Sequence, residues 1–407
     1  MTLDNNRQQL SDAIRAASEH LDIAPVYIEK DYWITKILQQ LSRTSQANNT
    51  VWKGGTSLSK AYRLIDRFSS DIDVAVLAEG MKGNQIKNLI SKVSKGMTEG
   101  IPETDVPGET SKGSHYRKTY HSYTSTLSGS DPRMKLLGNY VIVEINSFAN
   151  PYPYVRLEIE SFITQFLRET GRESLIEELD MAPFELNVLD KRRTICEKLV
   201  SLLRFSFTSQ PLDGLNKKIR HFYDLHALVN DAECREYLSQ SFLQDLKDLW
   251  QHDQSVFDTP DGWQGKNIDE APLIKDFSRL WTDLSEHYVE ELGQLAYRPI
   301  PTPEEIAKSL NELLQILYYF KIDIKDMKLT FDQKNMIINT LDNSKKSFAG
   351  LTLKFYDPVI RQFAFICYVK ADSVYNKDTI ELSIRNTLGT YFLNIDNNKL
   401  FIAKSEL

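Results

Sequence analysis

Lys53-Gly54-Gly55-Thr56-Ser57 is followed, after a short apolar segment, by Ser69-Ser70-Asp71-Ile72-Asp73, and these two stretches are the most informative of the sequence. Paired glycines beside hydroxyl residues favour a tight turn whose backbone N–H groups can face a phosphate. The second stretch opens the apolar run Ile72–Leu77, which predicts a strand. Because side chains alternate along a strand, we expect Asp71 and Asp73 on the same face.

This pair of carboxylates indicates a metal site. Two like charges that lie close together repel each other unless a cation lies between them. Mg²⁺ that carries a nucleoside triphosphate is the usual cation for such a pair. A phosphate-binding turn followed by a metal-binding strand is typical of an enzyme that transfers nucleotides.

Further motifs occur in order along the chain, and together they carry a family resemblance. They are Glu29-Lys30-Asp31-Tyr32-Trp33, then Gly54-Gly55-Thr56-Ser57-Leu58-Ser59-Lys60 with Arg67-Phe68-Ser69-Ser70-Asp71-Ile72-Asp73, then Arg193-Thr194-Ile195-Cys196-Glu197-Lys198, then Arg220-His221-Phe222-Tyr223-Asp224-Leu225. With these motifs the chain resembles the AbiEii/AbiGii toxin family of nucleotidyltransferase-like proteins. Such proteins are the toxins of toxin–antitoxin systems and of abortive-infection systems, and the resemblance therefore implies a role in phage defence. The resemblance spans residues 20–230 and fades beyond residue 300.

The resemblance implies an α+β fold with a polymerase-beta-like nucleotidyltransferase core, in which helices flank a mixed sheet. It also implies Mg²⁺ or Mn²⁺ as the cofactor and a nucleoside triphosphate such as ATP as the substrate. A cognate antitoxin is the expected partner. The expected acceptor is RNA, with tRNA as the first candidate.

Two metals held by three carboxylates form one class of nucleotidyl-transfer site, so a third carboxylate is expected near Asp71 and Asp73. Glu144 is the best candidate, because it is the only charge in the apolar strand predicted over residues 140–145. A carboxylate in such a strand is costly unless it is paired or bound to a metal. The alternative for Glu144 is a structural role, in which it pairs with an arginine at the sheet edge. Glu158 and Glu160 are its rivals for the metal role.

The resemblance completes the catalytic set, Asp71, Asp73, Glu144, Lys198 and Asp224. Lys198 is expected to contact the nucleotide phosphates, and Asp224 is expected to pair with Lys198 or to orient a basic side chain. The expected phosphate-binding residues are Lys53, Gly54, Gly55, Thr56, Ser57, Ser70 and Arg193. Arg193 lies about 140° from Lys198 around a helix, so the two side chains can point in different directions. Glu197 is expected to hold this helix in place, and His221 is expected to be structural.

The formal net charge of −7 argues against a protein that is coated in nucleic acid. It does not exclude a local basic groove. Basic residues cluster at Lys191-Arg192-Arg193, at Lys217-Lys218-Ile219-Arg220, and at Lys112, Arg117, Lys118, Arg133 and Lys135. Three scattered cysteines without metal-ligand spacing suit a reducing cytoplasm, and no apolar run is long enough to cross a membrane.

The chain is long enough for two or three domains. We expect an α/β nucleotidyltransferase lobe over residues 1–185, a helical lobe over 186–322 and a small α+β module of unknown role over 323–407. A helical stripe is predicted from Leu58 to Arg67. Prolines between Tyr297 and Pro303 stop any helix, and Thr302 is expected to cap the next one. In the C-terminal module the pattern predicts strands at 351–355, 363–369 and 400–403, and a helix capped by Asp378.

Two other functions remain open at the level of sequence. The same core could transfer a nucleotide to a small molecule or to a protein, as in antibiotic adenylylation. The chain could also be a catalytically silent regulator or adaptor that is bound by an antitoxin. The intact set of catalytic candidates argues against a silent protein, whereas sequence does not separate RNA from small-molecule acceptors.

Overall fold

The structure is a computed structural model that describes residues 1–127, 131–238 and 241–319 together with four strands between residues 352 and 404. Two compact units are present. The first contains Met1–Gln264 and Leu280–Ile306, and the second contains Gly265–Arg279 and Ala307–Leu407. No helix in the described part of the chain is long and apolar enough to span a membrane.

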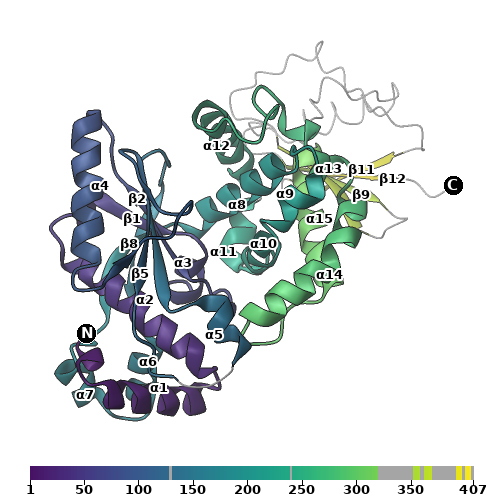
Figure 1. The fold of residues 1–407 in the computed structure, drawn as a ribbon. Helices are drawn as coiled ribbons and strands as arrows, with labels where there is room; N and C mark the ends of the chain where they lie inside the picture. Colours follow the sequence, from purple (N-terminus) through teal and green to yellow (C-terminus); the bar gives the residue numbers. More distant parts are fainter. Residues whose placement is uncertain are drawn as a thin grey trace. The chain divides into compact units, whose positions relative to one another are not determined.

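An eight-stranded mixed sheet forms the centre of the first unit (Figure 1). Its strand order is β3-β5-β6-β2-β1-β8-β7, with β4 beside β5. The strands β2 and β6 are parallel, as are β1 and β8, and the other pairs are antiparallel. The bounds are β1 Thr50–Lys53, β2 Asp71–Val76, β3 Glu103–Thr104, β4 Ser111–Lys112, β5 Tyr116–Ser122, β6 Tyr140–Asn146, β7 Tyr154–Ile159 and β8 Phe184–Leu189.

Helices flank this sheet, which confirms the expected α+β class. The bounds in the sheet-bearing part are α1 Arg7–Leu21, α2 Pro25–Arg43, α3 Gly55–Lys60, α4 Gly83–Met97, α5 Pro132–Leu137, α6 Phe162–Glu169 and α7 Glu173–Glu178. The later helices are α8 Lys191–Phe205, α9 Pro211–Asn216, α10 Arg220–Asn230, α11 Ala232–Leu238, α12 Phe242–Val256, α13 Pro272–Lys275, α14 Phe277–Leu295 and α15 Pro303–Tyr319.

One face of the sheet is apolar and carries the core. Its side chains include Ile72 and Val74 from β2 and Val143 and Ile145 from β6, all fully buried. Helices α2 and α4 contact this part of the sheet and each other. Since side chains alternate along each strand, the opposite face carries the residues between these apolar positions. That opposite face holds the charged residues of β2 and β6.

Helix α2 carries three consecutive charged residues, Glu29, Lys30 and Asp31, that are buried. Each of them fixes a different segment of the chain. Glu29 accepts hydrogen bonds from the loop after β5, Lys30 donates to carbonyls just before and at the start of β6, and Asp31 binds α3 and the first residue of α6. The partners are Ser125 and Thr126 for Glu29, Leu137, Gly138 and Tyr140 for Lys30, and Lys60 and Phe162 for Asp31.

The prediction of a helix from Leu58 to Arg67 was wrong in its second half, because α3 ends at Lys60. Arg63 then takes a left-handed backbone conformation with φ of 53°, which a continuing helix does not allow. The following residues instead run beside the segment after α14. The N–H of Phe68 donates to the carbonyl of Leu295 at 2.8 Å, and Arg67 and Ala296 form an isolated β-bridge.

Thr302 caps α15 as predicted, because its hydroxyl accepts from the N–H of Glu305 at 3.3 Å. In the second unit the strands are β9 Thr352–Asp357, β10 Gln362–Tyr368, β11 Tyr391–Asp396 and β12 Lys399–Lys404, in the order β10-β9-β12-β11. β9, β10 and β12 lie close to the three predicted strands, whereas β11 was not predicted. The helix predicted after Asp378 lies outside the described residues. The domain boundaries at residues 185 and 322 stay a proposal, and β8 straddles the first of them.

Candidate active site

Four neighbouring strands place charged side chains in one row on the polar face of the sheet. Lys53 of β1 lies opposite Asp73 of β2, Asp73 lies opposite Glu144 of β6, and Glu144 lies opposite Lys118 of β5. Residues in register on adjacent strands point to the same face, and Asp71 shares that face because it is two residues from Asp73. The register therefore places the three predicted metal ligands on the same face of two adjacent strands.

The charge balance of this row fits a hard cation. The pKa of Asp73 is raised to about 7, because burial and the charges of Glu144 and Asp71 raise it more than Lys53 and Lys198 lower it. The positive side chains present thus leave part of the negative charge unmatched. Carboxylate oxygens are the ligands that Mg²⁺ and Mn²⁺ prefer, so the donor set suits the implied metal.

The carboxylates of Asp71, Asp73 and Glu144 do not form a complete set of metal ligands in this structure. Within the described residues, no three His, Cys, Asp or Glu side chains converge on one point. Glu144 accepts a hydrogen bond from the Tyr116 hydroxyl at 3.0 Å, and Asp71 accepts one from the Ser70 hydroxyl at 2.9 Å. Binding of a metal by all three carboxylates would therefore need their oxygens to move closer together.

The turn between β1 and α3 is built directly against this centre. Gly54 has φ of 86°, and a Cβ atom at this position would lie 2.2 Å from Oδ2 of Asp73. A Cβ atom at Gly55 would lie 2.6 Å from Nη2 of Arg67. Both glycines are therefore needed for close approach, and Gly54 is needed for its left-handed conformation as well.

The two hydroxyl residues of the turn bind its backbone. Thr56 donates to the carbonyl of Asp71, and Ser57 donates to the carbonyl of Gly54 at 2.8 Å. These bonds hold the turn against β2. The first N–H groups of α3 have no intrahelical acceptor, as at any helix start. Contact of these residues with a phosphate stays a prediction.

A buried ion cluster lies on the helical side of the site. Asp224 of α10 accepts from Nε and Nη2 of Arg67 at 2.7 and 2.6 Å, and Nζ of Lys198 lies 2.6 Å from its Oδ2 atom. Burial alone would raise the pKa of Asp224, but Arg67 and Lys198 hold it well below its ordinary value. Asp224 therefore fixes two cations at once. The Lys198 pairing was one of the two roles expected for Asp224.

Lys198 links this cluster to the row on the sheet, because its charge lowers the pKa of Asp73. A second link comes from Lys53, whose ammonium lies 2.6 Å from the Glu197 carboxylate. This pair joins β1 to α8, in keeping with the structural role expected for Glu197. Arg193 lies apart from the row, since its guanidinium donates to the carbonyl of Asn150 at 3.4 Å.

Arg67 is the site residue that sequence reasoning missed. It belongs to the stretch that precedes β2, and it is buried with 2% of its surface exposed. The available signal was an arginine four residues before the predicted metal-binding strand, within a family motif. Its partner Asp224 is 157 residues away in the sequence, so no local sequence pattern predicts the pair.

The rivals of Glu144 lie elsewhere. Glu158 is exposed on β7, the strand at the far end of the sheet from β3, where it is in register with Glu185. Glu160 accepts from Arg63 and from Arg168, each at 2.5 Å. Neither side chain shares the row that contains Asp73.

We expect Glu144→Gln to lower the rate of nucleotide transfer on the order of 10³-fold, because loss of metal assistance removes several kcal/mol of transition-state stabilisation. Glu158→Gln is the matched control and should retain the wild-type rate. Single-turnover transfer of labelled nucleotide measures both rates. A third ligand just after β7 would be indicated if Glu160→Gln were the inactive variant instead.

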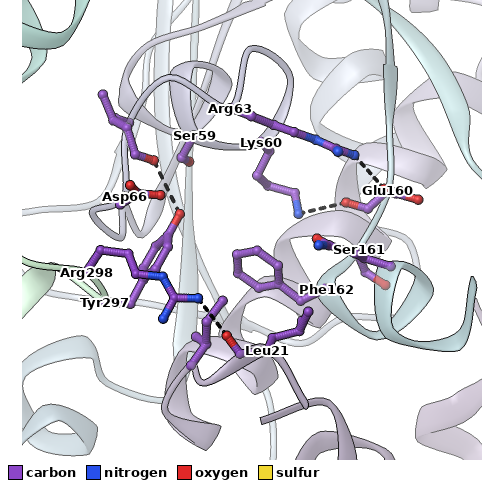
Figure 2. Close-up of a pocket in the computed structure, with 13 residues that line it drawn as sticks. Leu21, Ser59, Lys60, Arg63, Asp66, Glu160, Ser161, Phe162, Tyr297 and Arg298 are labelled. Carbon is purple, nitrogen blue, oxygen red and sulfur yellow. Dashed lines mark hydrogen bonds and ion pairs between the residues drawn. The ribbon is translucent and has the colours of Figure 1, made fainter. Parts of the chain in front are cut away.

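A separate cavity of about 190 Å³ lies beside α3 and is lined partly by Ser59, Lys60, Arg63, Glu160 and Arg298 (Figure 2). Its charged residues Lys60, Arg63, Glu160 and Arg298 are engaged with other protein groups. Arg63 binds the Glu160 carboxylate, Lys60 donates to the Glu160 carbonyl at 3.1 Å, and Arg298 donates to the Leu21 carbonyl at 2.8 Å. Asp71, Asp73 and Glu144 do not line this cavity, so it is distinct from the row of charges.

Comparison with known families identifies the chain. The family described as nucleotidyl transferase AbiEii toxin of type IV toxin–antitoxin systems matches residues 36–314, which is more than half of the sequence. The chain belongs to this family. The AbiEii match includes the turn, the acidic strand, Glu144, Lys198 and Asp224, so the resemblance stated from sequence is confirmed. It ends within α15, and the β9–β12 sheet lies beyond it.

Among solved structures, MenT4, a nucleotidyltransferase toxin from Mycobacterium tuberculosis H37Rv, is similar to this AbiEii family member. The identity is 17%, the TM-score is 0.46, and the match covers 83% of this chain and 97% of that chain. No curated protein matches the sequence.

Proposed function

We propose that this AbiEii-family protein is a metal-dependent enzyme that transfers a nucleotide from a nucleoside triphosphate to an acceptor, with tRNA as the first candidate. The observation that carries the proposal is the row of Lys53, Asp73 and Glu144 on the sheet, together with Lys198 and Asp224 beside it. A cognate antitoxin is the proposed partner. Two free, buried cysteines, Cys196 and Cys234, suit action in a reducing compartment such as the cytoplasm.

The residues divide into three proposed roles. Asp71, Asp73 and Glu144 would hold Mg²⁺ or Mn²⁺, which when bound neutralises phosphate charge and activates the attacking oxygen. The turn at Gly54 would face the triphosphate with its N–H groups. Lys198 would bind a phosphate as a point charge.

Asp224 acts as a positioning residue in this scheme. Its bidentate bond to Arg67 and its ion pair with Lys198 are made without substrate. The two cations are therefore held in place before a nucleotide binds. Such preorganisation is the main contribution that a protein makes to phosphoryl and nucleotidyl transfer.

A small-molecule or protein acceptor is the second candidate, and the basic clusters bear on it. Much of their charge is neutralised by nearby carboxylates. Ion pairs join Lys191 to Asp231, Arg192 to Asp190, Lys112 to Glu103, Lys118 to Glu109, and Arg133 to Asp131. Paired cations attract an RNA backbone less than free cations do, so these clusters support the RNA acceptor weakly.

The deciding experiment incubates the purified protein with each labelled nucleoside triphosphate, Mg²⁺ and total RNA, and follows label into RNA. A parallel reaction with a cell extract freed of RNA tests the other acceptors. Label in tRNA that requires Mg²⁺ supports the full proposal. Label only in small molecules or protein replaces the acceptor, and no transfer with any nucleotide contradicts the enzymatic function.

Growth arrest on expression should depend on the same residues. Asp71→Ala and Lys198→Ala should each abolish arrest, because one removes a metal ligand and the other a phosphate contact. Glu185→Ala, which alters an exposed residue of β8, should remain toxic. Colony counts after induction, with protein levels compared on immunoblots, measure the effect. Arrest that survives both site variants would point to toxicity through binding alone.

A further inference from the structure

The turn between α9 and α10 carries a cation without an anionic partner. Lys218 lies in this turn, and its ammonium is 4.6 Å from the centroid of the Phe205 ring. Among the residues that the structure describes, the Lys218 ammonium donates to no acceptor and forms no ion pair. The other lysines around the site differ, because Lys53 pairs with Glu197 and Lys198 pairs with Asp224.

Lys218 lies two residues before α10, the helix that carries Asp224 of the candidate active site. Burial lowers its pKa, the cations Arg204, Arg220 and Lys198 also lower it, and Glu144 is the carboxylate that opposes them. Its charge is therefore in electrostatic reach of one predicted metal ligand and one predicted phosphate ligand. A half-buried cation that is surrounded mainly by other cations destabilises the fold. Such a residue is retained more readily where it serves a ligand.

Arg204 faces the same ring as Lys218, with its guanidinium 5.1 Å from the Phe205 centroid, and the charges of Asp253 and Asp258 offset only part of the effect of burial on its pKa. Its guanidinium lies 4.2 Å from the Phe257 ring centroid and 5.3 Å from that of Trp263, and its buried Nε atom has no acceptor. Aromatic faces stabilise a cation only partly. The two side chains thus place two cations at the Phe205 ring, and among the described residues neither of them forms an ion pair.

We propose that Lys218, with Arg204 as the second cation, binds a phosphate group of the nucleoside triphosphate. This inference rests on the proposed function and extends its phosphate site to the α9–α10 turn. A phosphate is the anion class that the proposed reaction brings to this point. Lysine suits it because an ammonium binds phosphate as a compact charge from several directions. The adjacent Lys217 is exposed and is the side chain expected to meet solvent.

The test compares Lys218→Met with Lys217→Met. Methionine keeps an apolar chain against Phe205 and removes the charge. The probes are inorganic triphosphate and each of the four nucleoside triphosphates, with Mg²⁺, measured by calorimetry. Lys218→Met should weaken binding by about tenfold or more, the usual effect of losing one charge-assisted hydrogen bond. Lys217→Met should bind as the wild type does, and Lys218→Arg should restore most of the affinity.

Thermal melting separates a binding role from a structural one. Because Lys218 lacks a counter-charge, Lys218→Met should melt at or above the wild-type temperature while it loses phosphate affinity. A clear fall in melting temperature, with no recovery of binding in Lys218→Arg, would show a structural residue and overturn the proposal. Wild-type affinity of Lys218→Met for inorganic triphosphate would also overturn it, including the case in which only RNA binding falls.

The experiments distinguish failure of the Lys218 phosphate site from failure of the proposed enzyme activity. If the wild-type protein transfers nucleotides and Lys218→Met retains triphosphate affinity, the function stands and the Lys218 site is rejected. If inorganic triphosphate binds through Lys218 but no nucleotide is transferred, the phosphate site stands and the proposed enzyme activity is rejected.

Discussion

Asp73→Asn is expected to lower the rate of nucleotide transfer on the order of 10³-fold or more, because Asp73 is the central carboxylate of the row and loss of metal assistance removes several kcal/mol of transition-state stabilisation. When no metal is present, Asp73→Asn should have a higher melting temperature than the wild type. Asparagine removes the charge that Glu144 and Asp71 repel. Activity and melting temperature should thus move in opposite directions.

The pH dependence of stability gives an independent measure of Asp73. Its pKa is about 7 in the folded protein, compared with an ordinary value of 3.8. Between these pH values the folded state binds more protons than the unfolded state, so the contribution of Asp73 to stability falls as the pH rises. Melting in chelator across this range should show the fall in the wild type and a reduced fall in Asp73→Asn.

Mg²⁺ should reverse that trend. At pH 8 it should raise the melting temperature of the wild type, since a bound cation stabilises the ionised carboxylates, and it should do so much less in Asp73→Asn. The exposed variant Glu185→Gln controls for non-specific effects of salt. A fully active Asp73→Asn protein, with the Mg²⁺ response intact, would rule out Asp73 as a metal ligand.

Asp224→Asn should have the largest effect on stability. The carboxylate is fully buried and balances both Arg67 and Lys198, so its removal leaves two buried cations with no counter-charge. Breaking a buried ion pair in this way costs about 3–5 kcal/mol. The control Glu185→Gln, from the exposed pair with Arg156, should cost less than about 1 kcal/mol. Urea denaturation followed by fluorescence measures both values.

A compensating variant tests whether unbalanced charge causes the loss of stability in Asp224→Asn. Replacing all three residues with apolar ones, Arg67→Met, Lys198→Met and Asp224→Leu together, should recover much of the lost stability, since apolar side chains can fill such a site without a charge imbalance. Nucleotide transfer should remain absent. If Asp224→Asn is as stable as the wild type, the cluster does not have the electrostatic role described above.

The acidic half of the candidate site could be placed from sequence because it depends on local rules. Alternation along a strand puts Asp71 and Asp73 on one face, and a single charge in an apolar strand singles out Glu144. The register that sets Asp73 opposite Glu144 is a long-range property, and the structure supplies it. The pair of Arg67 with Asp224 is of the same kind, because it joins a loop to a distant helix.

The errors in the fold have similar causes. The apolar spacing from Leu58 to Ile65 suits a helix, but tertiary pairing of the next residues with the segment after α14 ends α3 at Lys60. Propensity is a weak influence compared with such pairing. Strand β8 was missed because its residues, Phe184–Leu189, include Glu185 and Asn187 and so lack a continuous apolar run. Its place is fixed by β1 and β7 on either side.

The three buried charges of α2 restrict how the family can vary in length. Glu29, Lys30 and Asp31 each reach a separate segment, and an insertion in one of those segments would withdraw the partner from a charge that cannot reach water. We therefore expect insertions and deletions among relatives to avoid residues 125–126, 137–140 and 160–162. They should gather instead in surface turns such as 105–110, where the chain between β3 and β4 is mostly exposed. The motif at residues 29–33 would then be kept because it fixes the distances from α2 to three separate chain segments.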